Sequence, residues 1–430
     1  MEGDKGAGRL IHTSIFSSPP ELTKLTALIE SLDTPEDNSD YHTWLSRCWL
    51  TPQSAAHPIF KELVDYFMEE TGGHRKEPHK TNLRRHWEIV LLNLSRALFQ
   101  RHWLLVPMDN RAFKHGSIAS EAGFSYGPMQ VVIKYLHNQR WIKLKKGKRY
   151  KDQPTRTRIF PEKALNLYLT PLFLDSAEPF EAPYLKVGEP SDQWRRVVGD
   201  LPQDHPEILE MNRLNEYLEQ HRWACKAPVY LRYKKDFLHG GRLYTPFQNL
   251  PDKRVRLRIN TQIDQEAICE VDFSANHLRM QLANLYGIDA GDTPYEDIGE
   301  LASETDRSVV KAFITRAMGA SDRASAANSL REQRVTNARF EALEAATYKR
   351  FSGIKLFDAW THQAQNLEGQ ILKKIMLQGV EKDIVCLPVH DAVAVQQRHE
   401  QWAIEAMIST WSEVVCSDVK PRVKVDRAGS

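Results

Sequence analysis

The stretch AICEVDFSANHLRMQLANLYG, residues 267–287, decides how the second half of the chain folds. A mostly apolar run ends at Asp272, and helical spacing of apolar residues begins within a few positions. A second apolar run, DIVCLPVHDAVAV at 383–395, carries Asp391 at its centre. The two runs predict adjacent strands, the second folded into a hairpin. Two carboxylates on such strands can hold two Mg²⁺ ions about 3.5–4 Å apart, although an isolated aspartate is more often an ordinary turn or cap residue.

A helical segment between the two runs carries cations suited to a triphosphate. In DRSVVKAFITRAMG (306–319), Arg307 and Lys311 lie one helical turn apart, and Ile314 and Met318 continue that face. Two cations on one stripe supply the paired donors that a triphosphate needs. Taken alone, such a pair is also a common feature of a solvated helix surface.

Two shorter patterns bear on whether the candidate site binds nucleic acid or belongs to a hydrolase. In FLHGGRLYTPFQNLPDKRVRLRI (237–259), the glycine pair permits close backbone approach, so that Arg242 can reach a nucleic-acid groove. The dipeptide His390–Asp391 is also found in HD-type hydrolases, but without upstream metal-binding histidines it is a weak pattern. We therefore give the nucleic-acid interpretation more weight than the hydrolase one.

In this order the segments resemble the polymerase core of the family A DNA polymerases and their relatives, the single-subunit RNA polymerases. GGRLYTPFQNLP resembles the segment T-x-x-G-R-L-S-S-x-x-x-x-x-Q-N-I-P, and VDFSANHLRMQLA resembles motif A, D-Y-S-Q-I-E-L-R-x-L-A. RSVVKAFITRAMG is similar to motif B, R-x-x-x-K-x-x-x-F-x-x-x-Y-G, and PVHDAV resembles motif C, V-H-D-E. QNLEGQILKKIM (365–376) is similar to Q-G-T-A-A-D-I-I-K-x-A-M. The resemblance covers residues 235–395, with motif B the loosest part.

The resemblance implies a catalytic role for each matching residue. Asp272 and Asp391 would bind two Mg²⁺ ions, for which Mn²⁺ is expected to substitute, and the carbonyl of Phe273 would be a third ligand. Arg307 and Lys311 would hold the incoming triphosphate, with Lys311 also assisting the departing pyrophosphate. The implied reaction is attack of a primer 3′ hydroxyl on the α-phosphate of a nucleoside triphosphate.

The resemblance also implies contacts to the nucleotide sugar, the primer and the template. His277 and Met318 would lie against the incoming nucleotide, and His390 would lie beside the primer terminus. The remaining expected nucleic-acid contacts of this half come from Arg242, Gln248, Asn249, Arg254 and Gln365.

Three departures from the family pattern bear on the substrate. His277 stands where motif A has a glutamate that excludes ribose. Met318 takes the place of the motif B aromatic, on a helix one residue short, and Ala392 replaces the second motif C carboxylate. These changes leave open whether deoxyribonucleotides, ribonucleotides or both are used.

The first half of the chain carries a different pattern. Residues 1–75 predict a small helical region or arm, and 76–175 follow the order helix, short helix, turn, helix and basic hairpin that is typical of a winged helix-turn-helix. The expected wing, 145–158, holds seven basic residues against one acid. Cations on a protruding wing can neutralise DNA phosphates, although charge runs are often only solvated. The seven are Lys145, Lys146, Lys148, Arg149, Lys151, Arg156 and Arg158.

Bulk properties complete the expected organisation. Residues 176–206 are rich in proline and predict a linker, and 207–430 predict the polymerase core. The net charge of +2 gives no global field that favours nucleic acid. Five widely separated cysteines, the absence of a signal-peptide pattern and the lack of a long apolar run predict a soluble cytoplasmic protein with reduced thiols.

We therefore expect an α+β protein with a right-hand polymerase palm, built on an antiparallel sheet with helical fingers and preceded by a winged helix-turn-helix domain. The expected function is that of a compact DNA polymerase without an exonuclease domain, and priming is a further expectation. The expected partners are a DNA primer and template, nucleoside triphosphates and replication proteins of a mobile element, without a membrane. Two alternatives remain: an RNA-synthesising primase or RNA polymerase, supported by His277, and a catalytically inactive DNA-binding protein.

Overall fold

The computed structural model describes residues 42–52, 54–72, 75–115, 117–147, 156–188, 201–234, 236–251, 256–331 and 335–429. The chain is an α+β protein that divides into two compact units. The first contains residues up to Pro179 together with 223–227 and 249–258, and the second contains 180–222, 228–248 and 259–430. The chain thus passes between the units more than once, which the expected linear order of domains did not anticipate.

The first unit surrounds one long helix, α3. Its apolar side chains follow helical spacing, and most of the helix is buried, including Trp87. Trp87 stacks on Phe67 with 4.5 Å between ring centroids, and Phe99 stacks on Phe173 at 3.7 Å. The helices are α2 (His57–Gly72), α3 (His79–Gln100), α4 (Ile118–Glu121), α5 (Tyr126–Asn138) and α6 (Lys163–Phe173).

A four-stranded sheet lies beside these helices in the order β1-β3-β5-β4. Strands β4 and β5 form an antiparallel ladder in which Lys145 pairs with Arg158, as expected for a hairpin at this point. A separate short pair joins β2 to β6. The strands are β1 (His42–Trp44), β2 (Trp49–Leu50), β3 (Trp103–Leu105), β4 (Ile142–Lys145), β5 (Arg158–Pro161) and β6 (Ser176–Ala177).

Two residues mark the ends of helices in this unit. The short helix α4 is followed by Gly123, whose positive φ of 78° favours glycine. Ser125 occupies the N-cap position of α5, but its side chain does not cap the helix, and its N–H donates to His86 Nε2 instead. Residues 1–41, at the start of the expected arm, lie outside the described residues.

The second unit is built on a five-stranded antiparallel sheet with β11 at its centre. Strand β11 lies between β13 and β14, which shields Ile268, Cys269 and Val271 from solvent. Among the described strands β14 pairs only with β11, so it is an edge strand. The strands are β10 (Gln262–Ile263), β11 (Glu266–Phe273), β12 (Leu387–Val389), β13 (Ala392–Gln396) and β14 (Val423–Arg427).

A second sheet of this unit has three strands in the order β7-β8-β9. These are β7 (Leu185–Val187), β8 (Tyr230–Tyr233) and β9 (Gly240–Tyr244). Strands β6 and β7 both fall inside the expected linker, 176–206, so the beginning of that segment forms regular structure in both units. Residues 189–200 of the segment lie outside the described residues.

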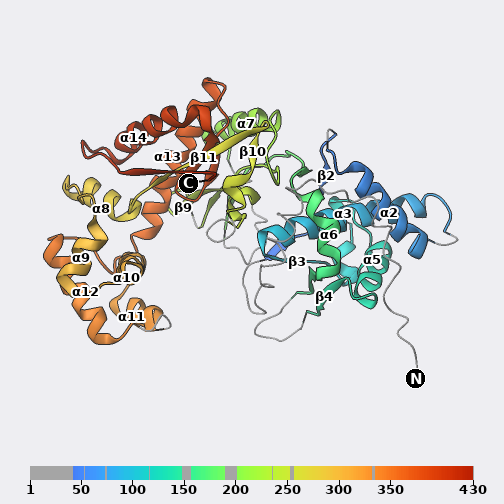
Figure 1. Ribbon diagram of the computed structural model, residues 1–430, viewed down its shortest axis with the longest axis horizontal. Coiled ribbons are helices and arrows are strands. Elements are labelled where there is room, and N and C mark those ends of the chain that lie inside the picture. Colours follow the sequence, from blue (N-terminus) through green and yellow to red (C-terminus); the bar gives the residue numbers. More distant parts are fainter. Residues whose placement is uncertain are drawn as a thin grey trace. The chain divides into compact units, whose positions relative to one another are not determined.

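Helices of the second unit form two groups (Figure 1). Helices α13 and α14 lie with the strands, and α14 packs on β11 and β13 as its amphipathic pattern predicts. Helices α9 to α12 pack on one another in a separate helical group (Figure 1). The helices are α7 (Pro206–Glu219), α8 (Asn276–Tyr286), α9 (Pro294–Ala302), α10 (Arg307–Gly319), α11 (Arg323–Arg331), α12 (Asn337–Arg350), α13 (Thr361–Glu381) and α14 (Glu400–Val415).

Helix α7 has a packing role in the second unit. Lys373 of α13 forms ion pairs with Glu207 at 2.8 Å and with Glu210 at 2.5 Å. Tyr217 donates a hydrogen bond to Asp383 at 3.2 Å. These contacts attach α7 along α13.

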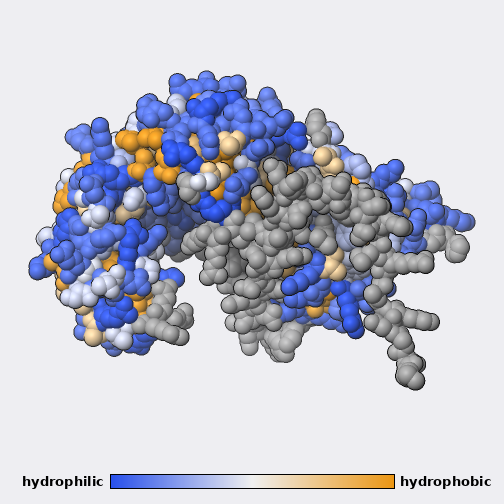
Figure 2. All heavy atoms as spheres, in the orientation of Figure 1, coloured by the Kyte–Doolittle hydropathy of each residue, from blue (hydrophilic) through white to orange (hydrophobic). Residues whose placement is uncertain are grey.

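The surface is mainly hydrophilic, and the cysteines form no disulfides. The face drawn in Figure 2 shows mainly hydrophilic side chains over the second unit, with scattered apolar ones. All five cysteines are free thiols. Within the described ranges, no helix has both the length and the apolar character required to cross a membrane.

Candidate functional site

The two predicted aspartates lie at one end of the five-stranded sheet. In the β11–β13 ladder Asp272 pairs with Ala392, and in the β12–β13 hairpin Ala392 pairs with Val389. The two residues between those strands form the turn, and Asp391 is one of them. The register therefore places Asp391, in the turn directly before β13, beside Asp272 near the end of β11.

The surroundings of Asp391 concentrate negative charge. Its pKa is raised to about 7, first because burial disfavours the charged carboxylate and then because the Glu368 and Asp272 carboxylates repel it. His277 acts in the opposite direction. The end of the sheet is thus an acidic site with a nearby imidazole.

Lys424 supplies a cation to Asp272 from the other side of β11. The two residues pair in the β11–β14 ladder, and Lys424 Nζ lies 2.9 Å from Asp272 Oδ2. The Lys424 side chain is 69% exposed, so solvent reaches this ion pair and the pair contributes little to stability. The sequence analysis did not single out Lys424, which lies in the stretch RVKVD at 422–426.

A buried carboxylate, Glu368, joins two of the predicted residues. Arg242 Nε lies 2.7 Å from Glu368 Oε1, and Arg242 Nη2 donates to Oε2 at 2.8 Å. His277 Nε2 lies 3.0 Å from Oε2. Burial alone would lower the pKa of Arg242, but the Glu368 carboxylate outweighs it and the pKa is raised. Arg242 and His277, predicted separately, therefore meet on one side chain.

The glycine pair before Arg242 does permit a close backbone approach, and the neighbour is a helix of this chain. Helix α13 packs directly on β9. A Cβ added at Gly369 would lie 1.7 Å from the carbonyl oxygen of Gly241. The side chain of Asn366 donates to the carbonyl of Phe237 at 2.8 Å and strengthens this contact.

The predicted triphosphate cations lie on the exposed start of α10. Asp306 caps this helix by accepting a hydrogen bond from Ser308 N–H at 2.8 Å. Arg307 contacts Glu296 at 2.5 Å, and its guanidinium lies 5.1 Å from the ring centroid of Tyr295. Lys311 is exposed one turn further along.

Tyr295 relates this end of α10 to the acidic site. Its pKa is raised to about 12, first by burial, and it interacts electrostatically with both Arg307 and Asp391. The sequence analysis did not single out Tyr295. The α9–α10 end of the helical group is therefore within electrostatic reach of Asp391.

Met318 and Gln365 differ in their access to solvent. Met318 is 1% exposed, because the segment that leads into α13 covers this end of α10: Phe357 N–H donates to Ala317 O at 2.6 Å. Met318 thus packs in the core, in contrast to the expected contact with a nucleotide. Gln365 is half-buried on α13, one turn before Glu368.

The other predicted contacts are spread over several elements. Phe273 is buried at the end of β11, directly after Asp272. His390 is exposed in the turn with a positive φ of 57°. Gln248 is buried and Asn249 is exposed, both in a short 3-10 helix, Pro246–Asn249. Arg254 lies outside the described residues.

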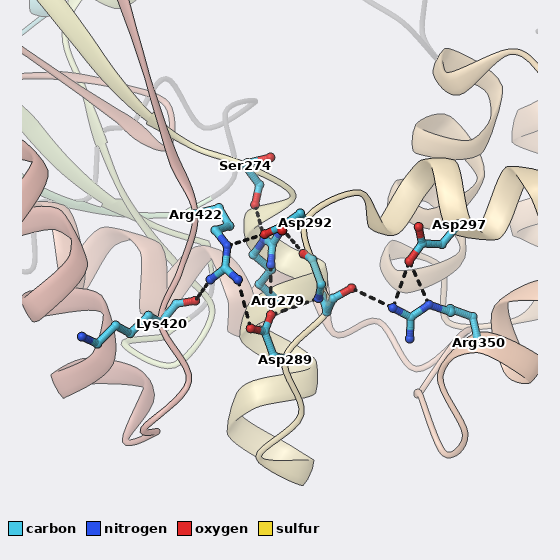
Figure 3. Close-up of polar contacts among 10 residues, drawn as sticks. Ser274, Arg279, Asp289, Asp292, Asp297, Arg350, Lys420 and Arg422 are labelled. Atoms are coloured by element: carbon cyan, nitrogen blue, oxygen red, sulfur yellow. Dashed lines mark hydrogen bonds and ion pairs between the residues drawn. The ribbon is translucent and has the colours of Figure 1, made fainter.

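A network around Arg279 fixes the chain after Asp272 (Figure 3). Arg279, 2% exposed, donates to Ser274 O at 2.8 Å and to Gly291 O at 2.6 Å, and contacts Asp289 at 3.4 Å. Asp289 also lies 3.3 Å from Arg422. The end of β11 and the loop before α9 are therefore held by one guanidinium.

Two more arginines extend this network (Figure 3). Arg422 contacts Asp292 at 2.8 Å, just before β14 begins. Arg350 of α12 binds Asp297 of α9 at 2.9 Å and the carbonyl of Ala290 at 3.3 Å. These contacts join the end of the sheet to the helical group within the second unit.

The predicted wing cations belong to the first unit. Lys145 Nζ lies 5.2 Å and Arg158 Cζ 5.5 Å from the ring centroid of buried Trp103. Lys146 and Arg156 are exposed. Three further predicted wing cations, Lys148, Arg149 and Lys151, lie outside the described residues.

The donor set suits a cation site that substrate completes. In the part of the chain that the structure describes, no three His, Cys, Asp or Glu side chains form a ready-made cation cage. Mg²⁺, however, is often held by one or two carboxylates together with substrate phosphates and water. Asp272 and Asp391 supply two carboxylates, and burial together with repulsion from the Glu368 and Asp272 carboxylates raises the pKa of Asp391, which a bound cation would counteract. These residues therefore fit Mg²⁺.

Comparisons with known proteins leave the family open. No protein-family model matches the chain, and no curated protein matches it. Among solved structures it is similar to the POL domain of Pol1 from M. smegmatis in complex with DNA primer-template and dNTP, at 12% identity and a TM-score of 0.33. The match covers 86% of this chain and 66% of that chain, slightly less than two thirds. A similarity at this level does not establish a shared fold.

Glu368 could have been found from its helix. Ala364, Glu368, Ile371 and Ile375 are buried at helical spacing, so a charged residue stands on the apolar face of α13. Such a residue needs a partner, because an unpaired buried charge is costly. Lys424 and Tyr295 carry no comparable signal.

Proposed function

We propose that the chain is a template-directed nucleotidyltransferase that extends a nucleic-acid primer with Mg²⁺ bound at Asp272 and Asp391. The observation that carries the proposal is the strand register that brings Asp391 beside Asp272. The ordered resemblance to family A polymerase motifs supports the same reaction. In this proposal the second unit contains a polymerase palm with its helical fingers, α9 to α12.

The residues of the second unit would share the work of binding. Arg307 and Lys311, at the exposed start of α10, would hold the triphosphate as paired cations. Arg242 would contact the primer terminus, and His277 would lie against the sugar of the incoming nucleotide. Asp272 and Asp391 would hold divalent ions, which when bound stabilise the charge that develops on the transferred phosphate.

The test measures incorporation of labelled nucleotides. Purified protein would be supplied with dNTPs or NTPs, on primed and unprimed templates, with Mg²⁺. We expect primer extension that Asp272→Ala and Asp391→Ala each abolish, because either change removes half of the carboxylate pair. The control is Asp418→Ala, which changes an exposed aspartate. Extension by either site variant at the wild-type rate would reject the proposed site.

The same assay separates the alternatives for the nucleotide. Extension with NTPs but not dNTPs would identify the RNA-synthesising alternative, which His277 supports. Products on unprimed template would identify priming. If the wild-type protein binds DNA but incorporates neither dNTPs nor NTPs, the result would favour the inactive DNA-binding alternative.

We further propose that the first unit is a winged-helix domain that binds DNA phosphates through its hairpin. The exposed cations Lys146 and Arg156 support this assignment. Each phosphate contact adds about 0.9 to the slope of log affinity against log salt, so a double change of these residues to Gln should reduce the slope. Lys61→Gln on the exposed face of α2 is the matched control. An unchanged slope would exclude these two residues from the interface.

A further inference from the structure

Glu368 is a buried carboxylate that contacts two of the predicted site residues. Its side chain is 1% exposed, and it receives Arg242 from β9 and His277 from α8, while belonging itself to α13. A buried carboxylate is costly unless it is fully paired, and removing one partner is more costly than never having had the pair. Side chains from three separate elements therefore meet at this one carboxylate.

The backbone holds Glu368 in a fixed position relative to Arg242. The neighbouring residue, Gly369, packs against the carbonyl of Gly241 so closely that a Cβ would overlap it. Gly241 immediately precedes Arg242. The carboxylate is thus placed by main-chain contact, and its position does not depend on a flexible side chain nearby.

The hydrogen bond to Glu368 also selects one form of the His277 ring. A carboxylate that pairs with Arg242 only accepts hydrogen bonds, so Nε2 of His277 must donate. In the neutral ring Nδ1 is then an acceptor. A ribose 2′-hydroxyl can donate to such an acceptor, whereas a deoxyribose has no group to offer there.

We infer that Glu368 is a positioning residue that aligns Arg242 and His277, so that it sets both the grip on the primer and the acceptance of ribonucleotides. This inference rests on the proposed function for its substrate, a nucleoside triphosphate on a primed template. It assigns to the His277 ring a preference for a sugar that carries a 2′-hydroxyl. Arg242 would act only on primer binding and His277 only on the choice of sugar, whereas Glu368 would act on both.

The central experiment replaces Glu368 by Gln. The amide keeps the size of the side chain but can donate to Nε2, so the ring is free to adopt the other tautomer. We expect primer–template affinity to fall about tenfold without metal, because the amide has no negative charge and only one oxygen that can accept from Arg242. The NTP-to-dNTP ratio of kcat/KM should fall at least about fivefold, mainly through KM for NTPs. The matched control, Glu381→Gln, changes a 61% exposed residue on the same helix.

Arg242→Ala and His277→Ala separate the two effects. We expect the first to reduce primer–template affinity and the second to reduce the NTP-to-dNTP ratio. In the Glu368→Gln background, each of these changes should have less than half of its effect in the wild type, since the alignment is already lost. A merely structural role for Glu368 would instead reduce the rates with NTPs and dNTPs equally and leave the ratio unchanged, which would overturn the inference.

A spectroscopic measurement keeps this test distinct from that of the proposed function. The ¹⁵N resonances of the His277 ring, assigned with the His277→Ala variant, should move in Glu368→Gln and not in Glu381→Gln. Failure of the wild type to incorporate any nucleotide would reject the proposed function and with it the role in sugar acceptance. Unchanged ring resonances and an affinity within about twofold of the wild type would reject the alignment itself.

Discussion

Lys424 Nζ lies 2.9 Å from the carboxylate of Asp272, on the strand that pairs with β11 on the side away from Asp391. The ammonium group thus stands beside one of the two carboxylates proposed to bind Mg²⁺. Because Lys424 is largely exposed, it can turn away when a divalent ion binds. In the proposed function the pair would balance charge at the site before substrate arrives.

Removing this ammonium should strengthen metal binding. We expect Lys424→Met to increase the affinity for Mn²⁺ about threefold to tenfold, because a nearby positive charge no longer competes for Asp272. The measurement is the paramagnetic resonance signal of free Mn²⁺ during titration. Lys420→Met, at an exposed lysine of the same segment, is the control. Weaker Mn²⁺ binding by Lys424→Met would show that the lysine supports the ion and does not compete with it.

Asp391 should make the metal-free protein less stable as the pH rises. Its folded pKa of about 7 lies above the ordinary value of 3.8, so the folded state binds the proton more tightly than the unfolded chain. Stability is therefore lost as the pH rises from about 4 to about 7, and the loss is complete above that window. Asp391→Asn carries no charge at any pH, so its free energy of unfolding should exceed that of the wild type more at pH 8 than at pH 5.

Denaturant titrations in a chelator at the two pH values measure this difference. Asp418→Asn, at an exposed position, should show no pH-dependent difference from the wild type. Saturating Mg²⁺ should reverse the order at pH 8, because only the wild type retains both carboxylates. A gap between Asp391→Asn and wild type that is equal at pH 5 and pH 8 would contradict the raised pKa.

Arg279 should be important for stability. Its guanidinium donates to two main-chain carbonyls, those of Ser274 and Gly291, from a buried position. Loss of two charge-assisted hydrogen bonds predicts a decrease of about 2–4 kcal/mol in the free energy of unfolding for Arg279→Ala. Arg323→Ala, which breaks the more exposed pair with Glu344, should cost about 1 kcal/mol or less. Equal losses in the two variants, measured by urea unfolding, would show that the network adds nothing beyond a surface pair.

The contact between α13 and β9 should not tolerate a side chain at Gly369. A methyl group there overlaps the carbonyl of Gly241, so Gly369→Ala should lower the free energy of unfolding by about 3 kcal/mol or more. Gly127→Ala is the control, because this helical glycine of α5 has open space around it and alanine is the better helix former. Thermal unfolding of both variants measures the contrast. A Gly369→Ala protein as stable as Gly127→Ala would mean that the two elements can separate without cost.

Local pattern was sufficient for much of the fold. Helix α14 and the sheet strand β11 follow from apolar spacing, and Asp272 and Asp391 stood out because each interrupts or ends an apolar run. The sequence could not reveal the Glu368 contacts, because its partners Arg242 and His277 are 126 and 91 residues away. Only tertiary packing determines such pairs.

Helix α10 shows why a stripe of residues is not enough to identify a surface. Arg307, Lys311 and Met318 share one face of the helix, as predicted, but the first two are exposed and Met318 is buried. The difference arises along the helix axis, where the segment before α13 covers the C-terminal end. Helical periodicity gives the angle of a side chain around the axis and carries no information about what covers each turn.

The main-chain contact between Gly369 and Gly241 has a consequence for sequence change over time. Spacing that is set by backbone atoms does not depend on the sizes of the surrounding core side chains. Apolar substitutions elsewhere in the second unit can therefore accumulate while the separation of Glu368 from Arg242 stays constant. Two residues without side chains would in this way protect the geometry of the site from drift in the remainder of the core.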